Sequence, residues 1–544
     1  MSNGEKDGID SNTIPLMFRA QVEGRSQIQR LIPGELRQQA YDWTDEWIEG
    51  ASKEVPQFGP EVRTKEYKIT WRMVANSGQD EGVIRPVIGA KGWPFYPGAS
   101  MKGAFLRACT DQEALKYCGG QVSKKETQPG ILRFHGGFPK EWNWTEKPLV
   151  DVVHPQQEWQ IEAQARHSAF IQISLYQPTL VFGISSSEAL DESQWQRIWQ
   201  IWQTALERGI GSRVSAGYGQ TRVHGSSKLL SVGLQGQGLA SQLVNKIPEF
   251  RPNMFKSALR GHTLRLFSGI TDEKTAQTLT KELWGGLNGK KGAIVGLLGV
   301  AFNPIELDLT SYTYRNNEMP IYELFDGMLT ILVMRSVSEK QKKNLRIFVT
   351  QLVKFAMLLG GFGKSWRRVD HRLVFPNYLI GNANPMIGCH WEFTERSERF
   401  YCPVNHLSDL TDFLTNLDKN LKGWLKLKKK KPSNAVSNWR EAWHPGNVQV
   451  WGRITRNQSD SEAVRWFHGP YRGEKSIKGT ELTGRLNRIG RIWHRMYPRY
   501  ITTEDGTPQA TGEYVELLTI FPDNSNNTQE FLKFLATDSG FSKL

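Results

Sequence analysis

The sequence has little cysteine and no long apolar segment. Only four cysteines occur in 544 residues, which is too few for a disulfide framework. The longest clean apolar run, Ala293 to Phe302, is about half of the ~20 residues that a transmembrane helix needs. The first residues, MSNGEKDGIDSNT, are polar and acidic, unlike a signal peptide. We therefore expect a cytoplasmic chain without a membrane partner.

Acidic residues are outnumbered by basic ones. The chain has 69 Lys and Arg against 55 Asp and Glu, a net charge of +14. This excess indicates a polyanionic partner, most simply nucleic acid, although charge alone does not separate DNA, RNA and plain solubility. The 19 Trp residues supply rings that can stack on bases, but most aromatic residues fill cores. At ~100–200 residues per domain, the length predicts more than one domain.

Two kinds of segment occur twice, in the same order. The first kind leads into a short helix with small and basic residues, as PGASMKGAFLR at 97–107 and RPNMFKSALR at 251–260. The second is a glycine-rich loop, GIGSRVSAGYG at 209–219 and GGFGKSWRRVD at 360–370. Lys102 and Gly211 are 109 residues apart, and Lys256 and Gly363 are 107 apart. The shared order and spacing predict two related units.

The hydrophobic pattern predicts strands mixed with helices in both units. This mixture favours an α+β fold in which helices cover the sheets, of the ferredoxin-like kind. Helices are expected at Glu192 to Arg208 and at Ser338 to Leu359. The strands expected in the first unit are 66–74, 170–176, 179–184 and 221–224. Those expected in the second unit are 229–234, 298–309, 329–334 and 371–375.

The C-terminal third has a different character. Residues 418–431 read DKNLKGWLKLKKKK, and this lysine run is either a solvated face or mobile loop, or an arm that binds phosphates. Strands at 449–454, 491–497 and 514–520 and a helix at 528–535 either complete the second unit's sheet or form an appendage. The arginine-rich segment 491–499 either contacts RNA or is a strand with a basic face.

Basic residues accompany both kinds of repeated segment. Glycine-rich loops expose consecutive backbone N–H groups to phosphate oxygens, and helix starts and basic side chains also contact phosphates. One such loop alone would be interpreted as a tight turn, but its recurrence with basic residues favours RNA binding. The tripeptide at 363–365 ends like a Walker A loop, yet position 358 is Leu where that motif needs Gly. The candidate RNA-binding residues are Ser100, Lys102, Arg107, Gly211, Arg213, Lys256, Arg260, Gly363, Lys364, Arg367 and Arg368.

A carboxylate loop precedes the first basic segment. It reads NSGQDEGVIR at 76–85 and places Asp80 and Glu81 between glycines. A carboxylate beside a bound phosphodiester can hold a divalent cation or orient the attacking oxygen. Taken alone, the pair would be a solvated turn. The corresponding stretch of the second unit, 236–250, has no aspartate, and Glu249 is its only acid.

Two further groups of residues are candidates for chemistry. Residues 389–390 and 402–406 supply two Cys and two His, but without the spacing of a zinc site, so ordinary core cysteines are expected. His154 lies in DVVHP at 151–155 and is of the type that acts in acid/base chemistry. No Ser or Cys partner can be named for it, so a structural role is expected. No metal ligands are assigned.

The order of these motifs resembles the RAMP superfamily of CRISPR-associated proteins. The likeness also includes GILRFHGGFP at 130–139 followed by DVVHP, and it is good over 66–224 and weaker over 229–376. Two such units in one chain resemble the fused double backbone subunit of a type III (III-D variant) effector complex. The resemblance implies two tandem modified ferredoxin-like (RRM-like) domains with thumb-type insertions. Their expected bounds are 61–228 and 229–544, with an N-terminal extension at 1–60, an insertion around 380–447 and a C-terminal extension.

The resemblance also implies a function. Such subunits bind guide RNA and target RNA together with other RAMP proteins and a large polymerase-like subunit. In active members an aspartate after the first strand cuts target RNA with a divalent metal, expected here to be Mg²⁺, as the ribose 2′-hydroxyl attacks the neighbouring phosphate. By position that aspartate is Asp80, so one cutting centre is expected, in the first unit. The alternatives are a catalytically silent guide-RNA scaffold and a guide-maturing ribonuclease that uses His154.

Overall fold

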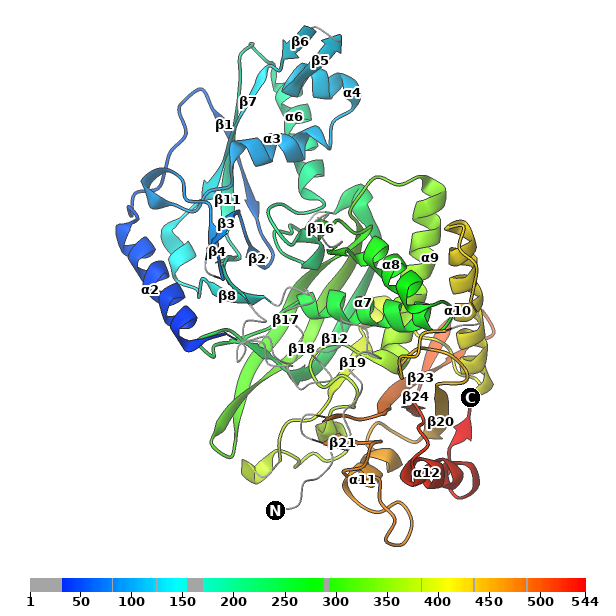
Figure 1. The fold of residues 1–544 in the computed structure, drawn as a ribbon. Coiled ribbons are helices and arrows are strands. Elements are labelled where there is room, and N and C mark those ends of the chain that lie inside the picture. The colour runs from blue at the N-terminus through cyan, green and yellow to red at the C-terminus, as the bar shows by residue number, and fades with distance from the viewer. Residues whose placement is uncertain are drawn as a thin grey trace.

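In the described part of the chain, helices are interspersed with mostly antiparallel sheets (Figure 1). The structure, a computed structural model, describes residues 32–544 apart from 81, 124–125, 154–169, 223, 288–292, 383, 434–435 and 486–487. The expected α+β class is confirmed. No helix in this described part has the length and apolar character needed to cross a bilayer.

The first unit contains two principal sheets. A three-stranded antiparallel sheet has the order β1 (Arg63–Lys68), β11 (Thr179–Ser186), β7 (Leu132–Pro139). A four-stranded sheet has the order β3 (Asn76–Asp80), β4 (Val83–Pro86), β9 (Phe170–Ile173), β8 (Val150–Val153). Two short pairs join β2 (Arg72–Met73) to β10 (Leu175–Tyr176) and β5 (Gly119–Ser123) to β6 (Glu126–Pro129). The helices are α2 (Gly34–Gly50), α3 (Gly98–Leu106), α4 (Asp111–Glu113) and α6 (Glu192–Leu206).

Helix α6 forms where the capping residue and the helical spacing of apolar residues predicted a helix. Asp191 caps its first turn by accepting a hydrogen bond from the Gln194 backbone N–H, in a capping box. Trp195, Ile198 and Trp202 follow at helical spacing and are all buried. The Trp202 ring lies 5.0 Å from that of Phe182 on β11, so this face of the helix covers the three-stranded sheet.

The second unit is built on one four-stranded sheet. Its order is β17 (Leu298–Tyr314), β18 (Asn317–Val333), β12 (Lys228–Leu239), β19 (Cys389–Phe393), and every pairing is antiparallel. Its helices are α7 (Asn253–Ser268), α8 (Glu273–Trp284) and α9 (Glu339–Phe355). Two short pairs join β13 (Ser241–Gln242) to β14 (Pro248–Glu249) and β15 (Gly286–Leu287) to β16 (Ala293–Ile294).

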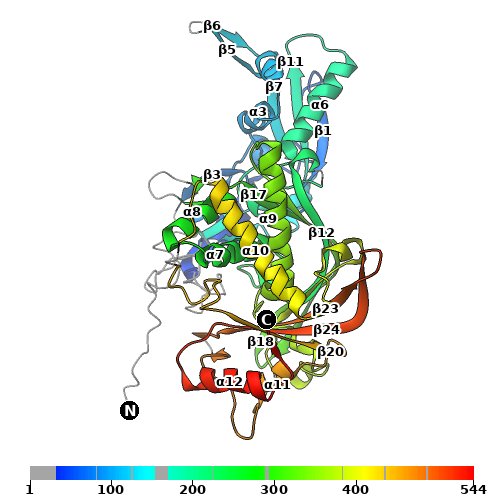
Figure 2. The ribbon, with the colours of Figure 1, turned by 90° about the vertical axis from the view of Figure 1, so that its right-hand side faces the viewer.

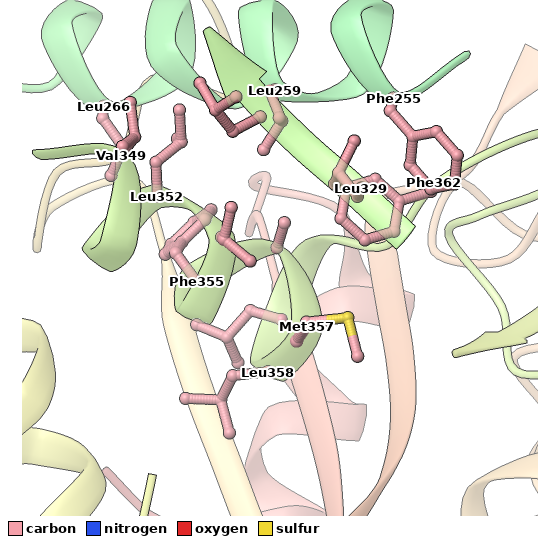
Figure 3. Close-up of a cluster of buried hydrophobic side chains, with 14 of the residues drawn as sticks. Phe255, Leu259, Leu266, Leu329, Val349, Leu352, Phe355, Met357, Leu358 and Phe362 are labelled. Atoms are coloured by element: carbon pink, nitrogen blue, oxygen red, sulfur yellow. The ribbon is translucent and has the colours of Figure 1, made fainter. Parts of the chain in front are cut away.

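Helices α7 and α9 form the core of this unit with the sheet (Figure 3). Phe255 and Leu259 of α7 and Leu352 of α9 are 0–1% exposed, as is Leu329 of β18. Ser338 caps α9 by accepting a hydrogen bond from the Gln341 backbone N–H, which places its start where the sequence predicted it.

The C-terminal strands form their own sheet rather than completing that of the second unit. The sheet has the order β23 (Ile492–Thr502), β24 (Pro508–Ile520), β20 (Gln449–Thr455), β25 (Ser542–Lys543). A short pair joins β21 (Gly484–Arg485) to β22 (Arg488–Ile489). The helices are α10 (Ser408–Leu427), α11 (Glu462–His468) and α12 (Asn526–Thr537). Figure 2 shows α10 beside α9, with the sheet below them.

Buried ionic contacts fasten this C-terminal part to the second unit. The guanidinium of Arg265, on α7, lies 2.6 Å from the Glu441 carboxylate and 5.1–5.3 Å from the rings of three tryptophans. Burial by itself raises the pKa of Glu441, but the charges of Arg367 and Arg265 hold that pKa below its ordinary value. Arg495, on β23, donates to the carbonyl of Gly360 at 2.8 Å.

Two expected strands are not present. The described residues of 221–224 form no strand. Instead, the chain just before them runs beside the segment that follows β1: Gly219 N–H donates to the Arg72 carbonyl, and Thr70 N–H donates to the Gln220 carbonyl. The strand expected at 371–375 is wrong, because the Asp370 carboxylate accepts from Arg372 N–H and starts a 3₁₀ turn at His371–Leu373. The strand that pairs with β12 comes later, as β19.

Candidate nucleic-acid interface

The two glycine-rich loops share a backbone conformation. In each loop, three residues two positions apart have left-handed φ: 81°, 82° and 59° at Gly209, Gly211 and Arg213, and 90°, 83° and 58° at Gly361, Gly363 and Ser365. The residue after the first glycine, Ile210 or Phe362, is buried in each loop. Glycine adopts this conformation without strain, which explains why the sequence repeats it at the first two of these positions, whereas the third is Arg213 or Ser365.

The first loop, although part of the first unit, is seated on the second. Lys256, on α7, donates from Nζ to the hydroxyl of Ser215 at 2.5 Å. A Cβ added at Gly217 would lie 3.7 Å from the Val300 carbonyl oxygen on β17 and 4.0 Å from Pro252. The loop therefore covers the start of α7 and the edge strand β17.

The second loop borders the same helix start. A Cβ added at Gly363 would lie 3.3 Å from the sulfur of Met254, in the first turn of α7. Lys364 follows Gly363 and is half-buried. Arg213 of the first loop lies beside Lys256 and Arg260 of α7, and Lys364 belongs to the second loop, which borders the first turn of the same helix. We call these four residues the junction cluster: Arg213, Lys256, Arg260 and Lys364.

Burial and neighbouring positive charges disfavour the protonated form of the two lysines in the junction cluster. Burial, with the charges of Arg260 and Arg213, lowers the pKa of Lys256 to about 7. Burial and then the charge of Arg251 lower the pKa of Lys364 to about 8. Within the described part of the chain, neither lysine forms an ion pair. The start of α7 adds its positive dipole end. An anion bound here would relieve this repulsion.

The nearby carboxylates are already paired. Arg72 lies 2.6 Å from Glu249, and Arg251 lies 2.6 Å from Asp151, all four side chains being 0–7% exposed. Tyr218 donates its hydroxyl to Asp151 at 2.8 Å. These pairs join the first unit to the second beneath the junction cluster. Glu249, the only acid in the second unit's stretch at 236–250, is thus a partner of Arg72.

The hairpin that carries Asp80 belongs to the sheet beside this junction. Asp80 ends β3 and pairs with Val83 of β4, and β4 runs parallel to β9. Gln172 of β9 accepts a hydrogen bond from Arg213 Nε at 2.8 Å. Across the sheet, Asp80 lies three strand spacings from Val152, which is ~14 Å at ~4.8 Å per strand. The Val152 carbonyl accepts a hydrogen bond from Arg251. One sheet thus connects Asp80 to the junction cluster.

The metal expected at Asp80 has no ligand set among the described side chains. The side chain of Asp80 and the residues Glu81 and His154 lie outside that description. Among the described residues, no group of three or more His, Cys, Asp or Glu side chains could hold a metal ion. Cys389 donates to the Phe362 carbonyl at 3.0 Å and is a core residue, as expected.

The candidate residues of the first unit lie on an open surface. Ser100, Lys102 and Arg107 lie on or at the end of α3 and are exposed. Their counterparts on α7, Lys256 and Arg260, are half-buried. Among the described residues, a loop of the first unit covers the basic helix of the second, whereas the basic residues of α3 in the first unit are exposed.

Arg367 and Arg368 are engaged inside the protein. Arg367 donates to the Glu441 carboxylate at 3.1 Å, and Arg368 donates to the carbonyls of Ile492 and Thr483. Burial lowers the pKa of Arg368 to about 9. Because these contacts hold the C-terminal part, we retain neither arginine as an RNA contact.

The arginines of 491–499 are likewise engaged. Most of the segment is strand β23; Arg491, just before it, pairs with Asp523 at 3.0 Å, and Arg499 on β23 donates to the Val404 carbonyl at 2.9 Å. The strand expected for this segment is present, but its arginines contact other parts of the protein rather than forming a free basic face. Sequence reasoning also missed Ser215 as a lysine partner, because the partner comes from the other unit.

Comparisons with known proteins give partial likenesses of fold. No family model and no curated protein matches the chain. A solved type IV-B CRISPR complex aligns with 29% of this chain and 86% of its own, at 15% identity and a TM-score of 0.21. The crystal structure of Cmr6 from Pyrococcus furiosus aligns with 30% of this chain and 98% of its own, at 14% identity and a TM-score of 0.19. Likenesses with such low TM-scores carry no argument about function.

Proposed function

We propose that this chain is a guide-RNA-binding backbone subunit of a type III CRISPR effector complex. The observation that carries the proposal is the junction cluster, in which cations from both units converge and neither lysine pairs with a carboxylate of the described residues. A phosphodiester backbone supplies the missing anions, and contacts of this kind hold RNA without reading its sequence. Base pairing between guide and target would then supply specificity.

The topology supports two tandem ferredoxin-like domains. The second unit runs β12, α7–α8, β17, β18, α9, β19, and its sheet places these four strands in the spatial order 2-3-1-4. The first unit runs β1, α3, β7, β11, α6, with the order 1-3-2. Residues 219–220 hydrogen-bond to the chain just after β1, where a fourth strand would lie.

The open surface of α3 supports assembly with further subunits. Within the chain, the glycine loop of one unit covers the basic helix of the next. The exposed Ser100, Lys102 and Arg107 present the equivalent, uncovered surface. A neighbouring effector subunit whose loop covered α3 would form a second junction and extend the positive track along the guide.

We also propose that target RNA is cut beside Asp80. The 2′-hydroxyl of the target ribose attacks the adjacent phosphorus and loses its proton, and the 5′-oxygen of the next nucleotide leaves and takes up a proton. The products are a 2′,3′-cyclic phosphate and a 5′-hydroxyl. The role of Asp80 is to orient or deprotonate the attacking hydroxyl. A divalent ion, expected to be Mg²⁺, would neutralise charge on the phosphate when bound.

The test uses the purified complex with its guide RNA. Asp80→Ala should abolish one target cut and leave target binding unchanged, with Glu81→Gln as the matched control that keeps the cut. An unchanged cut pattern in Asp80→Ala would refute the catalytic proposal and favour the silent scaffold. Metal-independent cleavage of precursor RNA by the isolated chain, lost in His154→Ala, would favour guide maturation.

A further inference from the structure

The C-terminal end of α10 carries a dense set of exposed lysines. The apolar residues of α10 include Leu417, Leu421 and Trp424, which are buried, and the Trp424 ring stacks 5.7 Å from Phe348 of α9. The opposite side faces solvent (Figure 2). We call its exposed basic residues the lysine surface: Lys419, Lys422, Lys426, Lys429, Lys430 and Lys431.

Little negative charge balances this surface. Lys422 pairs with Asp418 at 2.6 Å, and the half-buried Lys428 pairs with Glu282 of α8. The other five lysines of the surface form no ion pair with any residue the structure describes. Lys429 has a left-handed φ of 55°, and Lys430 N–H donates to the Leu425 carbonyl at 2.9 Å. Backbone hydrogen bonds therefore fix the chain that carries the lysines at the end of the helix.

The dipole of α10 does not account for so many lysines. A helix C-terminus favours cations only within its last turn, and each gains ~0.3–1 kcal/mol at a surface. Lys419 and Lys422 precede that turn, and adjacent lysines repel one another. A dense group of exposed lysines is instead typical of a surface that binds a polyanion.

The lysine surface is connected to the junction cluster through α8. Trp284 of α8 donates to the Thr263 hydroxyl of α7 at 2.8 Å, and Thr263 is ~10 Å along α7 from Lys256. Glu282, two residues before Trp284, holds Lys428. Helix α8 thus packs against α7, which carries Lys256, and holds the end of α10, which carries the lysine surface.

We propose that the lysine surface binds the phosphate backbone of RNA that extends beyond the junction cluster. This inference rests on the proposed function, because it takes the junction cluster as the first contact. It adds a second, sequence-independent contact whose strength depends on RNA length and on salt.

The test compares short and long oligouridine RNA. The variant replaces Lys426, Lys429 and Lys430 with Gln, and the control replaces three other exposed lysines, Lys478, Lys533 and Lys543. Affinity is measured by filter binding over a range of salt, with RNAs of roughly 10 and roughly 40 nucleotides. Each lost phosphate contact lowers the salt slope by about 0.7, so the variant should lose about 2 in slope on the long RNA. Its affinity for the long RNA should fall at least about tenfold, and that for the short RNA should be unchanged.

Several results would overturn the inference. They are an unchanged affinity for the long RNA, an equal loss in the control variant, or a loss seen with DNA of the same length but not with RNA. Failure of the proposed function has a different signature, namely no binding of the short RNA by the wild-type chain or no effect of Lys256→Gln upon it.

Discussion

Proton uptake should accompany RNA binding at the junction cluster. Lys256 has a pKa of about 7 in the free protein because it is buried beside Arg260 and Arg213. It is thus about 90% protonated at pH 6 and about 10% protonated at pH 8. A phosphate binds the protonated form, so affinity for RNA should fall about tenfold from pH 6 to pH 8. Lys364, with a pKa of about 8, adds about a twofold loss.

The assay is filter binding of short RNA at constant ionic strength, repeated at intervals between pH 6 and pH 8. Lys256→Arg is the matched variant, because an arginine keeps its charge throughout this range. It should bind RNA with only the small pH dependence that Lys364 gives. An affinity for wild-type protein that is flat between pH 6 and pH 8 would refute the argument, as would an equal pH dependence in Lys256→Arg.

Three further predictions concern stability, measured by chemical denaturation. Arg265→Met should destabilise the protein by about 3–5 kcal/mol, because it breaks a buried ion pair, whereas Arg197→Met at a surface pair should cost less than about 1 kcal/mol. Gly211→Ala should destabilise, since φ is 82° and the new Cβ would lie 2.3 Å from a backbone oxygen, whereas Gly423→Ala within α10 should stabilise by about 1 kcal/mol. Glu249→Gln should cost about 3 kcal/mol, because the buried Arg72 loses the carboxylate that it pairs with at 2.6 Å.

For each of these three stability predictions, one result would contradict the reasoning. Equal losses for the two arginine variants would show that burial of the Arg265 pair does not matter. A Gly211→Ala protein as stable as the wild type would show that the loop does not require a glycine conformation at this position. A neutral Glu249→Gln would mean that Arg72 finds other partners.

Local patterns in the sequence predicted the parts of the fold that local chemistry controls. Helices α6 and α9 begin at capping residues, Asp191 and Ser338, and continue with apolar residues at helical spacing. The repeated glycine loops were visible because left-handed backbone demands particular residues at fixed positions. These signals do not depend on the rest of the chain.

Long-range partners account for what the sequence could not show. Arg367 and Arg368 have the same charge as Lys364, but their partners Glu441 and Ile492 come 74 and 124 residues later. Charge alone therefore could not separate an arginine that contacts the interior from a lysine that forms no ion pair with the described residues. The seating of Ser215 on α7 likewise depends on how two distant units pack.

Crosslinking of bound RNA tests the central claim most directly. Ultraviolet crosslinking of short oligouridine to the purified chain, followed by mass spectrometry, identifies the peptides that touch RNA. We predict crosslinks in peptides from both units, at 209–219 and 251–260, and at 361–366 in the second loop. Crosslinks confined to the C-terminal sheet or to the outer face of α12, with none at these segments, would contradict the account.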